Sequence, residues 1–514
     1  MLKVIMNYFI SSFFKKTILF LYLIVFISSF SIAQTKTDTL EIAKELRNQK
    51  KFNKAISLLI TYKKSHPNDL NTIWLLAETY FWIKDIKTAD EQFSDAIKLF
   101  PENLYLQIDY AKMLFNIGDF KKAVNFIDKF LLYYPLNEEA LMMKAHIDYW
   151  QGNFDEANNT LQSILKNSPD NKKAISLLDE IQIVISPWLK LKSGYSNDDQ
   201  PLQSISSSIE GGMYFNSLAN ISFNFQSPFF IRDNKGSSAQ WFQINNKSEL
   251  NNLGLKIIFT AGVLKFPSNN FIDWTGSIEL NKTLSTHLNI IFEYERLPYF
   301  YTRSSLVNNL MVNELTASIE LNKSRDWNGK VSYIRNQFPD NNSTSVFYGW
   351  LFTPYLKFAG IEIRLGYEYN YTTSQENRFI SQEPLSYIVA NYNFNDLVPG
   401  IYDPYFTAND QQRHSILASL MVHPSGNIEA GINASYGISA STLNPFLTLV
   451  KDNNGTAYIK RDFAEQNFSP MRISTYALIH LNNKVSLKTE YEYQKSNFYN
   501  YHYVAAELKI NFWE

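Results

Sequence analysis

The first third of the chain repeats with a period of 34 residues. Prolines recur at this spacing, and two sets of alanines do the same. The positions are Pro67, Pro101, Pro135 and Pro169, then Ala43, Ala77, Ala111 and Ala145, and finally Ala55, Ala89, Ala123 and Ala157. Small residues let two helices approach closely, and a proline ends a helix because it has no backbone N–H to donate. The period therefore predicts four helical hairpins between residues 36 and 170, followed by a capping helix from Asp170 to Ile185.

This pattern resembles the tetratricopeptide repeat. Hairpins of that kind stack into a curved solenoid because no single hairpin can bury its apolar face alone. The resemblance implies that certain first-helix side chains face a concave groove. Carried onto this sequence, these groove positions are Trp74, Glu78, Phe81, Trp82, Tyr105, Ile108, Lys112, Phe115, Met142, His146, Tyr149 and Trp150. One interpretation is an aromatic-lined groove for a glycan or a peptide, and the alternative is that several of these rings pack between helices.

The amino end of the chain has the composition of an export signal. Lys15 and Lys16 precede a mostly apolar, uncharged stretch from Thr17 to Ala33. A basic segment, an apolar segment and small residues before the cleavage point are the parts of a secretory signal peptide. The sequence therefore predicts a signal peptide over residues 1–33 and a repeat domain over residues 36–185. An uncleaved inner-membrane anchor is the alternative, because residues 4–14 are also rather apolar.

From residue 187 onward, apolar and polar residues alternate, and the last segment shows this clearly. Val504, Ala506, Leu508, Ile510 and Phe512 fall on one side, and Tyr503, Ala505, Glu507, Lys509, Asn511 and Trp513 fall on the other. Successive side chains of a strand point to opposite faces, and a tilted strand crosses a bilayer in roughly 9–11 residues. Aromatic residues make up 15% of the chain, which suits a barrel with interfacial aromatic girdles. The pattern predicts a transmembrane antiparallel β-barrel over residues 187–514.

Short turns divide this region into strand pairs. They are predicted at Ser217, Asn251–Leu253, Ser285–His287, Lys323–Asn328, Ala359–Gly360, Pro424–Asn427 and Asn482–Asn483. A barrel with both chain ends on one side has one fewer short turn than half its strand number, so these seven turns predict sixteen strands. Poor alternation between Gln240 and Leu250 leaves fourteen or eighteen strands open. The longer connections, Thr373 to Arg413 and Ala440 to Met471, are predicted to be extracellular loops.

The polar face of each strand is predicted to line the lumen. A lone charge on the lipid face costs roughly 2–4 kcal/mol near the middle of the membrane, so the apolar face meets lipid. The candidate lumen residues are Glu293, Glu295, Glu362, Arg364, Glu368, Lys488, Glu490 and Glu492. With the other inward charges, they make a lumen that is mixed and slightly acidic, which argues against strong anion selectivity. Ion pairs that simply fill the barrel are an equally good interpretation.

Several classes of function lack their sequence signals. The chain has no cysteine, which excludes disulfides, thiol catalysis and cysteine-ligated zinc. The catalytic, P-loop and dinucleotide motifs are absent, and the seven histidines are scattered without metal-ligand spacing. A net charge of −1 offers no electrostatic basis for binding nucleic acid. We therefore expect neither an enzyme nor a cofactor-binding protein.

Together, these regions predict an α + β multidomain chain, in which an α-solenoid of about four repeats precedes a transmembrane β-barrel of about 16 strands. This layout resembles the outer-membrane exporters of cellulose and of poly-N-acetylglucosamine, and also the YaiO-type barrel proteins. The resemblance implies a bacterial outer-membrane location in contact with lipid, with the repeats in the periplasm. The exporters have many more repeats than this chain. Two functions stay open: a conduit for a glycan chain, and an anchored scaffold whose repeat groove grips a periplasmic protein.

Overall fold

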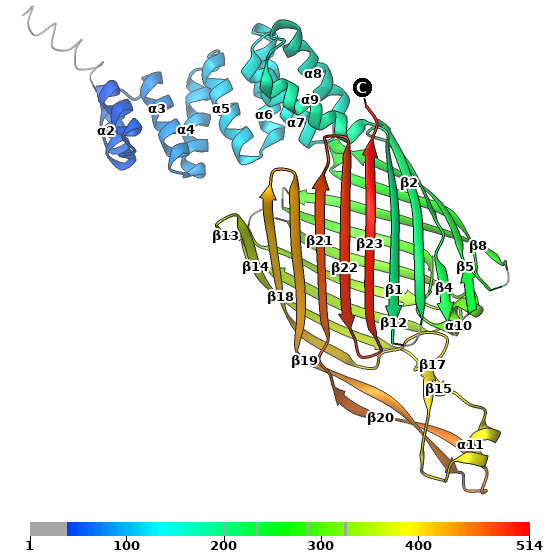
Figure 1. The fold of residues 1–514 in the computed structure, drawn as a ribbon. Coiled ribbons are helices and arrows are strands. Elements are labelled where there is room, and N and C mark those ends of the chain that lie inside the picture. The colour runs from blue at the N-terminus through cyan, green and yellow to red at the C-terminus, as the bar shows by residue number, and fades with distance from the viewer. Residues whose placement is uncertain are drawn as a thin grey trace, which may run out of the picture. The chain divides into compact units, whose positions relative to one another are not determined.

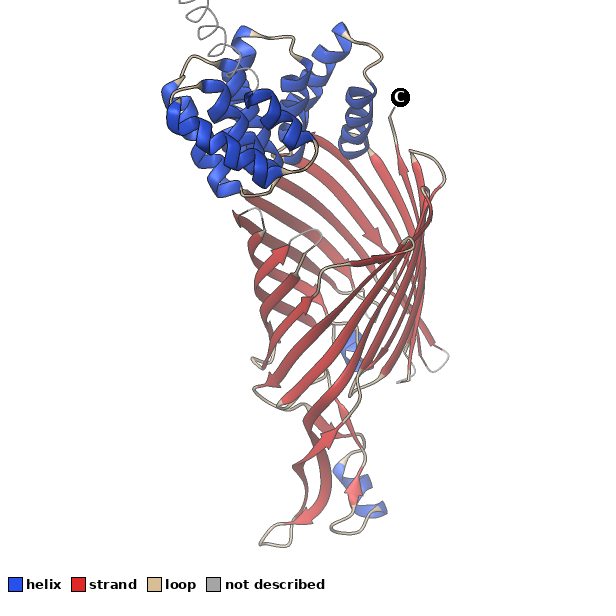
Figure 2. Cartoon of the chain, turned by 90° about the vertical axis from the view of Figure 1, so that its left-hand side faces the viewer, coloured by secondary structure: helices blue, strands red, loops and turns tan. Residues whose placement is uncertain are grey.

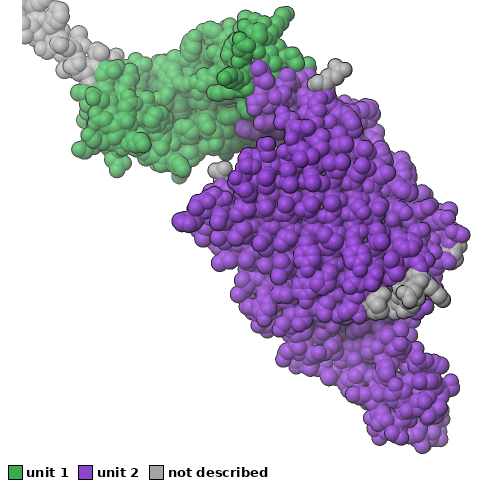
Figure 3. All heavy atoms as spheres, viewed as in Figure 1, with its two compact units in different colours: residues 1–147, 159–174 green, residues 148–158, 175–514 purple. Residues whose placement is uncertain are grey.

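The computed structural model describes residues 39–199, 202–232, 235–268, 270–285, 287–322 and 326–513. The predicted signal peptide, residues 1–33, lies outside the described residues. Figure 3 shows the two compact units of the chain, which are Met1–Ile147 with Asn159–Ala174, and Asp148–Asn158 with Ile175–Glu514. The predicted domain limits at residues 36–185 and 187–514 stay predictions.

The amino-terminal part is helical throughout, as the period predicts. A helix over residues 39–48 is followed by α2 Phe52–Ser65, α3 Leu70–Trp82, α4 Ile86–Leu99, α5 Leu104–Ile117, α6 Phe120–Tyr133, α7 Glu138–Trp150, α8 Phe154–Asn167 and α9 Lys172–Ile185. These helices form the four predicted hairpins, and α9 is the predicted capping helix. Each periodic proline lies in the turn that follows the second helix of a hairpin. None of the helices in the described ranges is long and apolar enough to cross a membrane.

The periodic residues explain how the repeat helices begin and pack. Ala77 and Ala111 have no exposed surface, so the neighbouring helices meet at these positions without a bulky side chain between them. Asp69 and Asn103 cap α3 and α5, accepting hydrogen bonds from the backbone N–H groups of the residues three positions later. A side-chain acceptor at this position satisfies one of the N–H groups that a helix start leaves unpaired.

The carboxyl-terminal part is a closed antiparallel barrel of sixteen strands, which confirms the predicted fold class (Figure 1). Its strands are β1 Trp188–Asp198, β2 Gln203–Asn216, β3 Ala219–Gln226, β6 Gln240–Leu250, β7 Leu255–Lys265, β8 Ile272–Ser285, β9 Leu288–Pro298, β10 Met311–Asn322, β11 Asn328–Gln337, β12 Ser343–Phe352, β14 Ile361–Ser374, β18 Gln411–Ser425, β19 Ile428–Lys451, β21 Met471–His480, β22 Val485–Lys495 and β23 Asn500–Asn511. The seven predicted turns each fall between two strands that pair with each other, although residues 286 and 323–325 of two of these turns lie outside the described residues. The poorly alternating segment is β6. β23 pairs with β1 from Trp188 opposite Asn511 to Asp198 opposite Tyr501, which closes the barrel.

The two faces of the wall differ as predicted. Phe292, Leu365 and Val504 point outward and are exposed, as are many other large apolar side chains of the strands. On the other face, Glu507 lies opposite Lys192 of β1 and opposite Lys488 of β22. A closed barrel satisfies every backbone hydrogen bond within the wall, and an apolar exterior matches lipid. The barrel therefore belongs in an outer membrane.

The two long connections lie at the end of the barrel opposite the short turns, and they are more regular than the predicted loops. Between β14 and β18 lie β15 Phe379–Ser381, α11 Leu385–Asn391, β16 Leu397–Val398 and β17 Gly400–Tyr402. β19 continues beyond the barrel wall and pairs with β20 Ala457–Asn467, so most of the predicted second loop is a two-stranded ribbon (Figure 2). Ile388, Val398, Leu447 and Leu449 form a buried apolar cluster that joins this ribbon to the first connection. That shared core explains why both connections are ordered.

Candidate functional site

The inner wall of the barrel combines aromatic rings with neutral polar groups. Strand register places the inward residues on one face from β1 round to β23. The inward rings are Trp188, Tyr214, Trp241, Tyr348, Trp350, Phe352, Tyr476, Tyr501 and Tyr503. The inward amides and hydroxyls include Asn224, Gln243, Asn245, Thr260, Ser277, Ser318, Ser332, Asn370, Ser419, Asn433 and Ser474. Such a wall offers both stacking surfaces and hydrogen-bonding groups to a solute.

Many inward charges neutralise one another, including three of the predicted lumen residues. Glu490 lies 2.5 Å from the ammonium of Lys192 and 3.2 Å from that of Lys488. Glu492 meets the guanidinium of Arg472 with two N–O distances of 3.0 Å. These pairs lie on β1, β21 and β22, so this side of the lumen carries little net charge.

The predicted residues of β14 have different partners. Glu362 pairs with Lys357 near the turn that joins β13 Leu356–Phe358 to β14. The guanidinium of Arg364 lies 4.4 Å from the ring centre of Phe352, which fits a cation–π contact. Glu368 is placed opposite Trp350 of β12. The structure therefore spreads these three side chains along the wall rather than gathering them at one point.

Acidic side chains gather on the other side of the lumen. Glu293 lies opposite Glu279 of β8, and Glu295 lies opposite Glu314 of β10. Lys256 approaches Glu279 at 3.6 Å. Within the described ranges, the other three carboxylates of this group have no ion pair. This part of the wall supplies the slightly acidic character that the sequence predicts.

A short segment, residues 402–406, crosses the mouth of the barrel at the end of the long connections; we call it the crossing segment. At one side, the backbone N–H of Phe406 donates to the hydroxyl of Tyr299 over 3.1 Å, and the hydroxyl of Thr302 donates to the carbonyl of Pro404. At the other side, the rings of Tyr402 and Phe406 lie 5.2 and 5.0 Å from that of Phe498.

These contacts join opposite sides of the barrel. Tyr299 and Thr302 belong to the connection between β9 and β10, and Phe498 belongs to the connection between β22 and β23. Six strands (β11, β12, β14, β18, β19 and β21) separate β10 from β22, and six (β1, β2, β3, β6, β7 and β8) separate β23 from β9. The crossing segment therefore narrows the mouth along a diameter.

Tyr405 anchors the crossing segment. Its ring is fully buried and stacks on Phe338, with 3.5 Å between ring centres and 3° between planes. Its hydroxyl donates to the carboxylate of Asp340, 2.7 Å away, and Arg378 lies 2.8 Å from the same carboxylate. Burial, together with the nearby Asp340 carboxylate, raises the pKa of Tyr405 to about 12, so the hydroxyl keeps its proton. Sequence reasoning missed this anchor, because no short motif links residues so distant along the chain.

In the repeat domain, the predicted residue Glu78 forms an ion pair with Arg47, and the guanidinium of Arg47 also lies 4.9 Å from the ring centre of Trp82. Arg47, Trp74 and Glu78 line a pocket of about 450 Å³. Trp82 is 53% exposed, whereas Trp74 and Phe81 pack partly against the helical core. Arg47 was not predicted, although its position next to an aromatic and acidic pair gives this groove its charge pattern.

The remaining groove predictions divide between exposed and packed side chains. Lys112 bridges Asp109 at 3.0 Å and Glu139 at 2.8 Å; burial alone lowers its pKa, but these two carboxylates outweigh burial and raise it. Trp150 is 53% exposed. Three other predicted rings have aromatic neighbours: Tyr105 with Phe130 and Tyr134, Phe115 with Phe120 and His146, and Tyr149 with Phe154.

Among the described residues, no group of three His, Asp or Glu side chains could hold a metal ion.

Comparisons with known proteins give a family match in the repeats. The tetratricopeptide repeat model matches residues 139–171. Among solved structures, the chain is similar to a bacterial polysaccharide outer membrane secretin, at 11% identity and a TM-score of 0.44, over 64% of this chain and 99% of that chain. It is also similar to a tetratricopeptide repeat protein from Parabacteroides merdae, at 15% identity and a TM-score of 0.26, over 28% and 56% of the two chains. A comparison with curated protein sequences gives no match. The chain thus combines tetratricopeptide repeats with an outer-membrane β-barrel.

Proposed function

We propose that the protein is an outer-membrane conduit through which a polysaccharide passes. The observation that supports this function best is the inner wall, where aromatic rings lie among amides and hydroxyls. Flat rings stack on the C–H faces of sugars, and amides and hydroxyls exchange hydrogen bonds with sugar hydroxyls. A barrel of sixteen strands is wide enough to hold an aqueous channel.

The charge arrangement also supports a neutral or weakly charged polymer. The pairs of Glu490 with Lys192 and of Glu492 with Arg472 leave little free charge along β21, β22 and β1. A strongly anionic polymer would meet the carboxylates of Glu293 and Glu295 on the other side, which have no ion pair with any residue that the structure describes. Like charges repel at close range, so an acidic glycan fits this lumen poorly.

In this proposal the repeat domain lies in the periplasm and receives protein partners. Residues 185–188 join α9 directly to β1, and β1 starts at the end of the barrel that carries the short turns. Outer-membrane barrels turn that end toward the periplasm. The pocket beside Arg47, Trp74 and Glu78 offers an apolar surface and both charges to a partner.

The second candidate is an anchored scaffold with little conductance, and the crossing segment favours it. Residues 402–406 bridge opposite sides of the mouth through Tyr299 and Phe498. If the segment stays in place, the barrel serves only as a membrane anchor. The repeat groove would then bind a periplasmic protein as the main activity.

Single-channel recording of the refolded full chain in a planar bilayer separates the two functions. A conduit gives discrete conductance steps, and a neutral linear oligosaccharide added to one side interrupts the current while it occupies the lumen. Replacing the inward ring Trp350 with Ala should shorten these interruptions, because one stacking surface is lost.

The matched control is Phe347→Ala on the outer face of the same strand, which should leave the interruptions unchanged. Absence of conductance in protein that is folded, as judged by heat-modifiable migration on gels, would instead support the scaffold.

A further inference from the structure

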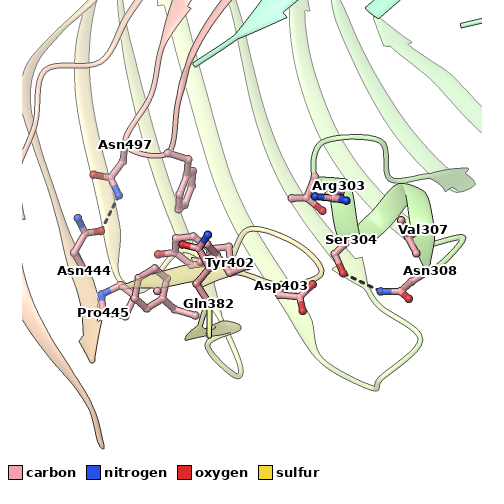
Figure 4. A pocket seen from close by; sticks show the side chains of 15 residues that line it. Arg303, Ser304, Val307, Asn308, Gln382, Tyr402, Asp403, Asn444, Pro445 and Asn497 are labelled. Carbon is pink, nitrogen blue, oxygen red and sulfur yellow. Dashed lines mark hydrogen bonds between the residues drawn. The ribbon is translucent and has the colours of Figure 1, made fainter. Parts of the chain in front are cut away.

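A pocket of about 890 Å³ lies at the mouth of the barrel, beside the crossing segment (Figure 4). Its walls come from four parts of the chain that are distant in sequence. Thr302 and Asn308 belong to the connection after β9, Gln382 and Tyr402 to the connection after β14, Asn444 to the ribbon strand β19, and Phe498 to the connection after β22. A pocket of this size matches the usual range for small-molecule sites.

The polar groups of the pocket are mostly neutral. The amide of Gln382 is exposed and, within the described ranges, has no hydrogen-bond partner. The amide nitrogen of Asn308 donates to Ser304 over 2.8 Å, which leaves its oxygen available as an acceptor. One cation, Arg303, and one acid, Asp403, also line the pocket, so their charges balance.

Aromatic rings form the apolar part of the wall. Tyr402 lies 5.2 Å from Phe498 and 5.1 Å from Phe379, and its ring is half-buried between them. These rings fix one another in place, so a ligand that packs against them does not have to order loose side chains. Rigid rings beside the amide groups of Gln382 and Asn308 favour a ligand with an apolar face and many hydroxyls.

We propose that this pocket binds a short stretch of a neutral glycan at the outer mouth of the barrel. The choice of a sugar rests on the proposed function, whereas the choice of a neutral one rests on the balanced charges and the amides of the pocket. Because its walls come from opposite sides of the mouth and from the crossing segment, an occupied pocket holds the glycan at the mouth, which the crossing segment narrows.

Calorimetric titration of the detergent-refolded full chain tests the proposal. The probes are linear pentamers of glucose, of N-acetylglucosamine and of a uronic acid. We expect at least one neutral pentamer to bind and the uronic acid pentamer not to bind. In the double variant Asn308→Ala/Gln382→Ala, binding should weaken about tenfold, which corresponds to about 1.4 kcal/mol, because two hydrogen bonds to the glycan are lost.

The control variant is Asn454→Ala, which removes an exposed amide at the tip of the β19–β20 ribbon, outside the pocket. It should bind like the wild type. The proposal is overturned if no neutral pentamer binds, if only the uronic acid pentamer binds, or if the folded double variant binds as tightly as the control. If a neutral pentamer binds but no sugar passes through the barrel, the conduit is refuted and the binding site in the pocket is supported. If sugar passes but no pentamer binds, the binding site is refuted and the conduit is supported.

Discussion

The repeat domain and the barrel both rely on large apolar side chains, but the repeats point them into the protein and the barrel points them outward. Phe93 of the repeats is 1% exposed and lies inside a helical core, whereas Phe292 of the barrel is 54% exposed and lies on the outer wall. In water, an apolar ring is stable when it is buried, but in a bilayer the lipid itself is the apolar surroundings. Burial within the protein therefore accounts for the stability of the repeat core, but not for the stability of the lipid-facing wall of the barrel.

The largest effect that tests this contrast is expected in the repeats. Phe93→Ala should lower the free energy of unfolding by about 3–5 kcal/mol, because it leaves a cavity in the core. Chemical denaturation of a fragment covering residues 36–185 measures the loss. Trp82→Ala is the control, since this ring is largely exposed and its loss should cost much less. If both substitutions lower the free energy of unfolding equally, the two rings are equally packed and the expected difference between them is wrong.

A charge placed on the barrel should reveal the reverse arrangement. Phe292→Arg puts a cation into lipid near the middle of β9. This should lower the free energy of unfolding of the barrel by roughly 2–4 kcal/mol. Its neighbour Ile291 faces the lumen opposite Ser318, so Ile291→Arg should be nearly neutral. Folding into vesicles over a range of urea concentrations measures both variants. If Ile291→Arg costs as much as Phe292→Arg, the assignment of the two faces is wrong.

Local periodicity was enough to predict both architectures. The alanines and prolines at a spacing of 34 residues locate every hairpin, and the capping residues Asp69 and Asn103 follow the same spacing as a further signal. The turns of the barrel were equally visible, because each lies between two alternating segments. Each helix end and each turn depends on residues close by in the chain, and the repeats show the same local signal every 34 residues, so a sequence displays these features directly.

The mouth of the barrel could not be predicted in this way. Tyr405 contacts Phe338 and Asp340, which lie on another connection, and the crossing segment also reaches Phe498. Such contacts depend on how three connections meet in space, and no periodic signal records them. The ribbon of β19 and β20 was likewise predicted as a loop, because its pairing continues a strand beyond the membrane.

The anchor of the crossing segment should have an intermediate effect. Tyr405→Phe keeps the ring on Phe338 but removes the hydrogen bond to Asp340, which should weaken the local structure by about 1–3 kcal/mol. The connection of residues 375–410 should then be cleaved faster by protease in intact vesicles, and mean conductance should rise. Tyr387→Phe, on the exposed side of α11, is the control. An unchanged cleavage rate would mean that Tyr405 does not hold the segment.

The smallest effect concerns ion preference in the lumen. Replacing both Glu293 and Glu295 by Gln should reduce cation preference, because these carboxylates lack ion pairs within the described ranges. Reversal potentials in a salt gradient measure the change, which should shrink at high salt as screening increases. Glu465→Gln on the outer ribbon serves as the control. A similar shift in that control would assign the preference to the surface rather than to the lumen.

Sugar release from vesicles tests the conduit most directly. Proteoliposomes are loaded with a fluorescent neutral oligosaccharide too large to cross the lipid, and its release is followed over time. If the barrel is a conduit, the sugar is released at a rate that rises with the amount of folded protein, and no sugar is released when the protein is heat-unfolded before reconstitution. Release of small ions from the same vesicles, with the oligosaccharide retained at every amount of protein, would contradict the conduit.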